Sequence, residues 1–84
     1  MNVRIYDNGG RTFDRFTAVF MDWREPSGLY GAVGMSEHPC HPQGFGQWTA
    51  AQPGRHLGRC IRLSELPPDC RALVLDYLRE MEAA

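Results

Sequence analysis

Residues 2–21, NVRIYDNGGRTFDRFTAVFM, place two strand-like segments on either side of a strong turn signal. Asn2–Tyr6 alternates apolar and polar side chains, a pattern that predicts a strand. Asp7–Gly10 then contains Asn-Gly, which favours a type I′ turn because both central residues of that turn need positive φ. Thr12–Met21 is rich in aromatic and β-branched residues and predicts a second strand. The whole segment therefore predicts a β-hairpin.

Three later segments also predict strands: Leu29–Met35, Gln47–Ala51 and Arg59–Leu63. Turns containing proline and glycine lie at residues 22–28 and 53–54, between the predicted strands. Gly31 and Gly34 fall inside a predicted strand, where glycine indicates a bulge or a close backbone approach.

Towards the C-terminus the period of the apolar residues changes from that of a strand to that of a helix. They recur at i, i+3, i+4, i+7, i+8 and i+11: Cys70, Leu73, Val74, Tyr77, Leu78 and Met81. This spacing predicts an amphipathic helix with one apolar stripe. Pro67 and Pro68 suit its first turn, where a missing N–H is harmless. Strands followed by a helix predict an α+β fold. We expect a single domain over residues 1–84, with an antiparallel sheet of about four strands and one C-terminal helix packed on it.

The composition indicates a small domain without a strong electrostatic preference. Nine arginines, no lysine and ten acidic residues leave a formal net charge of −1, so bulk charge selects neither nucleic acid nor membrane. The longest apolar run, Ala18–Met21, is far too short to span a bilayer. The first residues lack the basic and apolar regions of a signal peptide. Three cysteines, an odd number, argue against a disulfide framework. We therefore expect a cytoplasmic protein with free thiols and no membrane contact.

Gly34–Cys60 is the chemically richest stretch, because it holds all three histidines and two of the three cysteines. Five of its side chains are candidate zinc ligands: His38, Cys40, His41, His56 and Cys60. Their spacing matches no standard ligand pair, so a small zinc-binding structural module is only a third hypothesis, and no metal or other cofactor is predicted. Cys40 and His41 are a weak catalytic pair, because adjacent side chains usually diverge and nothing resembles a nucleophile elbow. We expect no enzyme activity.

A recognition surface is the better interpretation of this stretch. Residues 52–62 contain three arginines and a histidine but no acidic residue, and the segment before them contains aromatic side chains. Arginine and tryptophan are enriched at the hot spots of protein interfaces, and basic groups with aromatics also bind single-stranded nucleic acid. We predict the partner contacts to be Phe45, Gln47, Trp48, Arg55, His56 and Arg59. If the interface is acidic instead, the expected contacts are Asp14, Asp22 and Glu25.

Several short runs resemble a group of small proteins from phages, plasmids and integrated elements. The opening run consists of Tyr6–Gly10, Thr12 and Asp14–Thr17. The centre consists of Gly34–Ser36, Pro39, His41–Pro42 and Gly44–Gln47. The last runs, before the predicted helix, are His56–Gly58 and Leu66–Pro67. The resemblance covers most of the chain, although Cys40 lies outside its pattern.

Small proteins of mobile elements include many anti-CRISPRs, and the chain resembles a type I anti-CRISPR protein. The resemblance implies stoichiometric binding to a host type I CRISPR surveillance (Cascade) complex, and with it a block of target DNA binding. The alternative is a nucleic-acid-binding accessory protein of a mobile element, whose direct contact with single-stranded DNA or RNA weakens steeply with salt. We expect a monomer in the cytoplasm of a bacterial host.

Overall fold

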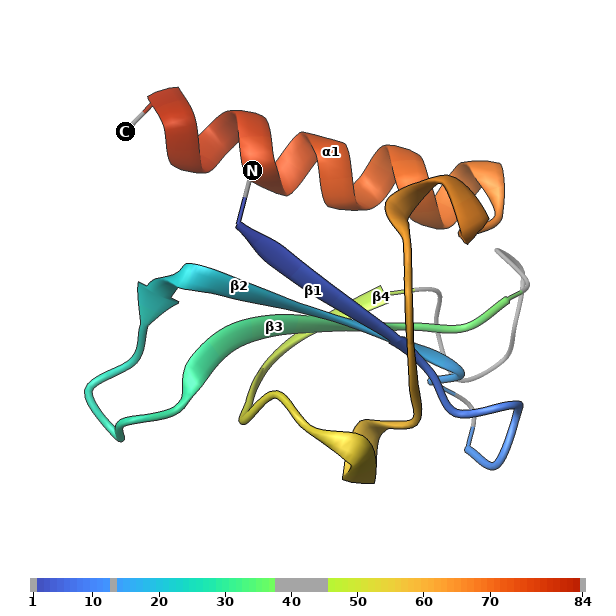
Figure 1. Ribbon diagram of the computed structural model, residues 1–84. Helices are drawn as coiled ribbons and strands as arrows, with labels where there is room; N and C mark the ends of the chain where they lie inside the picture. The colour runs from blue at the N-terminus through green and yellow to red at the C-terminus, as the bar shows by residue number, and fades with distance from the viewer. Residues whose placement is uncertain (1, 13, 38–45, 84) are drawn as a thin grey trace.

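The chain folds into one antiparallel sheet with a single long helix packed on it (Figure 1). A computed structural model describes residues 2–12, 14–37 and 46–83. The strands are β1 (Val3–Asp7), β2 (Phe16–Arg24), β3 (Tyr30–Met35), β4 (Gly46–Ala51) and β5 (Arg59–Ile61). The helices are the 3-10 helices η1 (Arg55–Leu57) and η2 (Leu63–Glu65), and α1 (Pro68–Ala83). The predicted α+β fold with a C-terminal helix is confirmed.

The sheet has five strands, in the order β4-β3-β2-β1-β5, where about four were predicted. The two strands nearest the C-terminus, β4 and β5, lie at opposite edges of the sheet. β4 pairs with β3, and β5 pairs with β1. β5 ends at Ile61 rather than at the predicted Leu63, because the chain turns there into η2. The Glu65 carboxylate accepts a hydrogen bond from the backbone N–H of Arg62 at 2.7 Å and closes that turn.

The predicted β-hairpin is confirmed, because β1 and β2 pair antiparallel, but its predicted type I′ turn is wrong, because Asn8 does not have a positive φ. β1 ends at Asp7 and β2 begins only at Phe16, so the connection between them is longer than predicted and the predicted strand start at Thr12 is too early. The carboxylate of Asp7 accepts a hydrogen bond from the Gly9 N–H at 2.8 Å, and the Asn8 side chain accepts one from the next N–H, also at 2.8 Å. These side chains stabilise the loop in place of cross-strand pairing. β2 instead continues to Arg24, into the segment predicted to be a turn.

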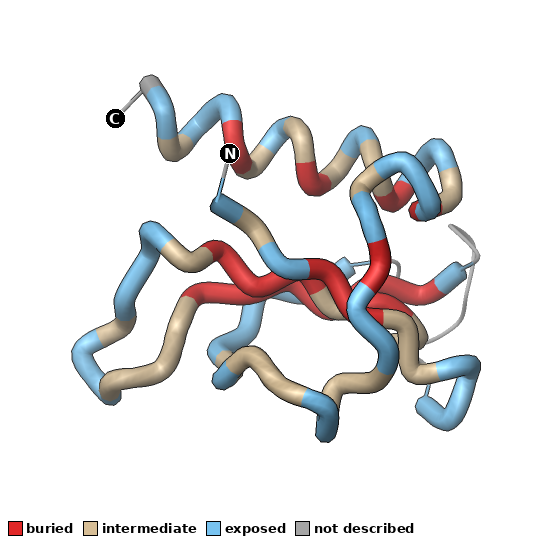
Figure 2. The backbone as a smooth tube through the Cα atoms, viewed as in Figure 1, coloured by how far each residue is buried: buried red, intermediate tan, exposed pale blue. Residues whose placement is uncertain are grey.

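The main core lies between α1 and one face of the sheet. Alternate residues of the strands supply its floor, including Ile5, Phe20 and Val33, and the helix contributes the predicted stripe through Cys70, Val74 and Leu78. Figure 2 shows the buried residues gathered in the middle of the sheet and on the sheet-facing side of α1. In the described part of the chain, no helix is long and apolar enough to cross a membrane.

A smaller cluster lies on the opposite face of the sheet. Tyr6, Val19 and Ala32 are buried there, and Leu57 of η1 packs against them. The segment that carries η1 lies on the side of the sheet opposite α1 (Figure 1). Both faces of the central strands are therefore covered, while the outer side of β4 stays at the edge of the sheet.

Candidate functional site

An aromatic groove lies between the C-terminal half of α1 and strand β4. It encloses about 350 Å³ and is lined by Trp23, Trp48, Tyr77, Glu80 and Met81. The two indoles meet edge to face, with ring centroids 5.8 Å apart and planes at 80°. The Trp48 and Tyr77 ring centroids are 5.2 Å apart. Trp23 is 43% exposed and Trp48 is 40% exposed, and these are the large apolar side chains that the described surface leaves open. Exposed aromatic side chains that converge on one hollow are typical of binding sites.

Gly31 makes the meeting of the two indoles possible. A Cβ atom on this residue would lie 2.6 Å from Cδ1 of Trp23 and 2.6 Å from Cζ2 of Trp48, far inside van der Waals contact. The close approach predicted for a glycine in this strand is thus present, and the approaching groups are side chains. The glycine lets both rings rest on the backbone of β3.

An irregularity in β2 brings Trp23 to the groove. Phe20 faces the helix and is stacked on Trp48, with centroids 5.9 Å apart and planes at 12°. Strict alternation would place Trp23, three residues later, on the opposite face. The register between β2 and β3 shifts between Phe20 and Arg24, and such bulges redirect side chains. The shift explains why Trp23 and Trp48 lie on the same side.

The groove wall formed by α1 is acidic. Glu80 lines the groove itself, and Asp76 lines the adjoining hollow of about 340 Å³ together with Leu73, Tyr77 and Glu80. The Asp76 carboxylate forms an ion pair with Arg79 on the exposed helix surface, where Nη1 of Arg79 and Oδ1 of Asp76 are 3.3 Å apart. No ion pair involves Glu80 within the portion of the chain that the structure describes. Among the described residues that line the two hollows, none is basic.

The predicted contact residues are dispersed by the fold. Trp48 lies in the groove, but its neighbour Gln47 points to the other face of β4, because successive residues of a strand alternate. Arg55 and His56 are exposed on η1, beneath the opposite face of the sheet. Arg59 is on β5, at the far edge from β4. Phe45 lies outside the described residues. The structure thus does not bring Trp48 and Arg59 onto one surface, and their role as contacts stays a prediction.

Sequence reasoning missed most of the groove. The sequence pattern predicts a turn around Trp23, and it places Tyr77 and Met81 in the apolar stripe of the helix without indicating a groove. Two signals could have indicated the groove: Gly31 inside a strand, and the presence of two tryptophans in so short a chain.

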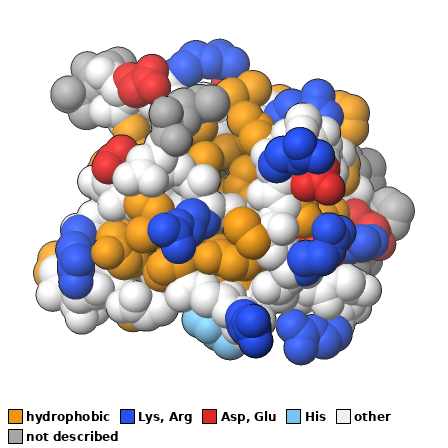
Figure 3. All heavy atoms as spheres, in the orientation of Figure 1, with side chains coloured by type: hydrophobic (Ala, Val, Ile, Leu, Met, Phe, Trp, Pro, Cys, Tyr) orange, Lys and Arg blue, Asp and Glu red, His pale blue; other side chains and the backbone are white. Residues whose placement is uncertain are grey.

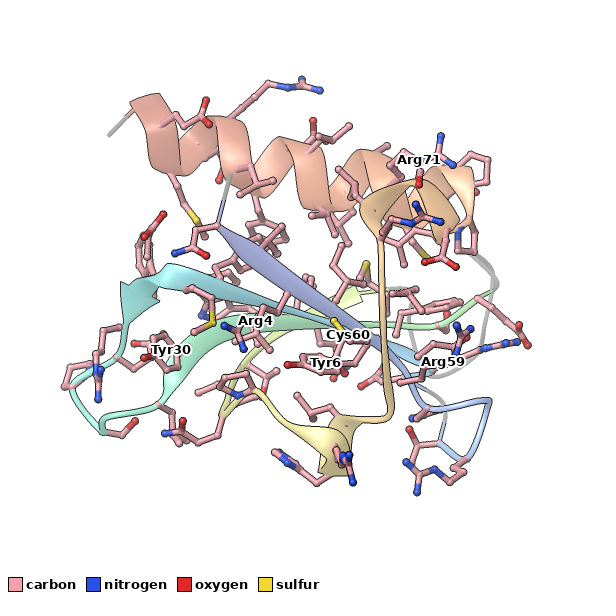
Figure 4. The ribbon with its side chains drawn as sticks, viewed as in Figure 1. Arg4, Tyr6, Tyr30, Arg59, Cys60 and Arg71 are labelled. Carbon is pink, nitrogen blue, oxygen red and sulfur yellow. The ribbon has the colours of Figure 1, made fainter. Side chains whose placement is uncertain are left out.

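A second surface, on the side away from α1, carries arginine side chains. Arg4 extends from β1 to this side and is exposed, and Tyr30 lies there as well, whereas Tyr6 is buried beneath it (Figure 4). In the lower part of Figure 3, the part opposite α1 in Figure 1, several arginine side chains surround an apolar area. The Arg24 guanidinium lies 5.1 Å from the centroid of the Tyr30 ring, as in a cation–π pair.

A network of ion pairs centres on Arg15, which immediately precedes β2 and contacts Asp7 at the end of β1. Its guanidinium donates two hydrogen bonds to the Asp7 carboxylate, from Nε at 2.9 Å and from Nη2 at 3.2 Å. It donates a third to Glu37 at 2.6 Å, and Arg59 approaches Asp7 to 4.0 Å. The hydrogen bonds from Arg15, the Gly9 N–H and the nearby positive charges lower the pKa of Asp7 below its usual value of 3.8, although burial opposes them. The network joins four segments of the chain, which indicates a structural role.

Replacing Asp7 with asparagine should therefore lower the stability of the protein in a pH-dependent way. Because the folded-state pKa of Asp7 is depressed, its contribution is present above the unfolded-state value of 3.8 and disappears as the pH falls through the lower folded-state pKa. Urea unfolding of the wild type and the Asp7→Asn variant, measured from neutral to acidic pH, should give a stability difference that shrinks below about pH 4. A difference that stays constant across this range would contradict the role assigned to the carboxylate.

The described cysteines give no sign of a reactive thiol. Cys70 is fully buried, its Sγ lies 3.3 Å from the carbonyl oxygen of Ser36, and burial raises the pKa of its thiol to about 11. Cys60 is exposed on β5. Within the described ranges, no three His, Cys, Asp or Glu side chains cluster closely enough to hold a metal ion. Three of the predicted zinc candidates, His38, Cys40 and His41, lie outside those ranges.

Comparisons with models of protein families, with curated proteins and with solved structures give no match. The fold and the groove are therefore the basis for any functional conclusion beyond the sequence resemblance.

Proposed function

We propose that this protein acts by stoichiometric binding, as an anti-CRISPR-type inhibitor that occupies a host type I CRISPR surveillance complex and keeps it from target DNA. The observation that carries the binding part is the groove with its two exposed, mutually packed tryptophans. Tryptophan is the side chain most enriched at hot spots of protein interfaces, because one ring buries a large area at little entropic cost. The surveillance complex as partner comes from the sequence resemblance.

The test is an affinity capture with the tagged protein, from a lysate that contains a type I surveillance complex and has been treated with nuclease. The wild type should retain the complex, and the captured complex should no longer bind target DNA. The variant Trp23→Ala should reduce recovery about tenfold or more, as expected for an interface hot spot. If the wild type retains no complex, the proposed partner is wrong.

Charge reversal separates the groove from the basic surface predicted from sequence. Arg55→Glu and Arg59→Glu change two exposed side chains that lie away from the groove. Recovery that survives both reversals but fails with Trp23→Ala assigns binding to the groove. The opposite pattern assigns it to the arginine-rich segment.

The alternative, direct binding to nucleic acid, is favoured by the arginines of the second surface (Figure 3). Arg4 is exposed there, and no ion pair involves it within the described ranges. Affinity for a single-stranded oligonucleotide should then fall steeply with salt and weaken in Arg4→Ala. The absence of binding at low salt would remove this alternative.

A further inference from the structure

Strand β4 is an edge strand whose own sequence and pairing show none of the usual protection. Its sequence from Gly46 to Ala51, GQWTAA, contains no charged residue and no proline, and its pairing with β3 is regular over all six residues. Natural sheets protect exposed edges with charges, prolines, bulges or short strands, because a bare edge recruits another strand. The opposite edge follows that rule, since β5 has only three residues and begins with Arg59. The β4 edge is therefore suited to accept a strand from a partner.

The groove adjoins this edge through Trp48, which belongs to β4 and lines the hollow on the helix side. A strand paired to β4 would send alternate side chains towards α1, and the one next to Trp48 would enter the hollow between the indoles and Tyr77. The three aromatic rings and the Met81 side chain of the hollow favour a partner side chain with a long apolar stem. The rings also favour a positive charge over their faces.

The acidic side chains of the groove wall formed by α1 also favour a partner side chain that combines an apolar stem with a positive charge. Glu80 lines the groove without an ion-pair partner among the described residues, and Asp76 stands one turn earlier on the helix. An arginine or lysine of the partner could lay its apolar stem over the indoles and bring its charge to Glu80. A second copy of the chain fits less well, because its own β4 carries no cation and would bring further carboxylates to the same place.

We propose that the protein binds an extended segment of its partner as a sixth strand on β4, and that the groove holds one long cationic side chain of that segment. This inference rests on the proposed function, because it takes the partner to be a protein, and it specifies which feature of the partner is recognised.

The test uses synthetic peptides and NMR spectra of the full-length protein. The first peptide alternates threonine and valine around one central arginine, and the second replaces the arginine with norleucine. The arginine peptide should shift the indole N–H signals of Trp23 and Trp48 and the amide signals of β4, and should bind about tenfold more tightly than the norleucine peptide. Equal binding of both peptides would overturn the cation pocket. No shift in β4 or the indoles at millimolar peptide would overturn the whole inference.

Two isosteric variants supply the matched control. Glu80→Gln removes the carboxylate at the groove and should weaken the arginine peptide about threefold without altering the norleucine peptide. Glu82→Gln makes the same change on the same helix, but Glu82 lines a different hollow, so its binding should not change. Equal effects of the two variants would contradict recognition by Glu80. Both positions are exposed, so folding should be preserved.

The same variants distinguish this inference from the proposed function. If the peptide binds as expected but the surveillance complex is not captured, the partner class is wrong and the strand-and-cation site stands. If the complex is captured equally well by the wild type and Glu80→Gln, and neither peptide binds, the inhibitor function stands and this inference fails. Concentration-dependent dimers in sedimentation experiments that involve the β4 edge would replace the partner strand with a second copy.

Discussion

Replacing Gly58 with alanine is expected to destabilise the protein by about 3 kcal/mol. Gly58 connects η1 to β5 with φ 115° and ψ −157°, a conformation that is essentially restricted to glycine. A Cβ atom there would also lie 2.6 Å from the carbonyl carbon of Asp7 and 2.7 Å from Cα of Asn8. Both atoms belong to the backbone, so neither can rotate away, and β5 would have to separate from the end of β1.

Gly28 provides the matched control for this prediction. Its φ is also positive, at 93°, but a Cβ atom would meet nothing within 4 Å. Gly28→Ala should therefore lose only the backbone term, about 1 kcal/mol. Urea unfolding of the two variants and the wild type measures both losses. Equal losses would show that the contact between Gly58 and the β1 end does not determine the effect.

Replacing Phe20 with alanine is expected to cost about 4 kcal/mol, the range for a large buried aromatic side chain. Phe20 is 1% exposed and packs on Trp48 and Tyr77 at once, so its removal opens a cavity beneath the groove. A domain of this size has only a few kcal/mol of stability. Phe20→Ala should thus be largely unfolded at room temperature, with loss of the near-ultraviolet circular dichroism signal.

Trp23→Ala is the comparison for this second prediction. Its indole is 43% exposed and lies over the strand surface rather than within the core. The expected loss is about 1 kcal/mol, typical of a single substitution. A folded Trp23→Ala and an unfolded Phe20→Ala would show that the groove can be altered without loss of the fold. If Phe20→Ala stays folded, the packing beneath the groove is less important than inferred.

Some elements could be predicted because their signals are local. The helical stripe beginning at Cys70 has a period that matches only a helix, and the helix was found where expected. The alternation in Asn2–Tyr6 likewise corresponds to β1. The start of β2 could not be predicted, because hydrogen bonds from backbone N–H groups to the side chains of Asp7 and Asn8 compete with strand pairing in the loop before it. Such competition is decided by the geometry of the folded loop.

The candidate site depended on features that no local pattern reports. Trp23 reaches the groove only because the β2–β3 register shifts, and Tyr77 serves both the core and the groove because α1 lies beside an edge strand. Arg59, predicted to join Trp48, lies at the other edge because the strand order places β4 and β5 apart. Trp48 and Arg59 are thus close in the sequence but distant in the fold, whereas Trp48, Trp23 and Tyr77 are distant in the sequence but in contact in the fold.

The sequence by itself determined the secondary structure class, the helix and most strand positions of this protein, because periodicity and turn residues act over a few positions. Only the tertiary structure decided which edge of the sheet stays open and which side chains converge beside it. Those outcomes depend on strand order, on a bulge and on the contact of Gly31 with two distant indoles. They are properties of long-range packing, which the order of residues along the chain does not display.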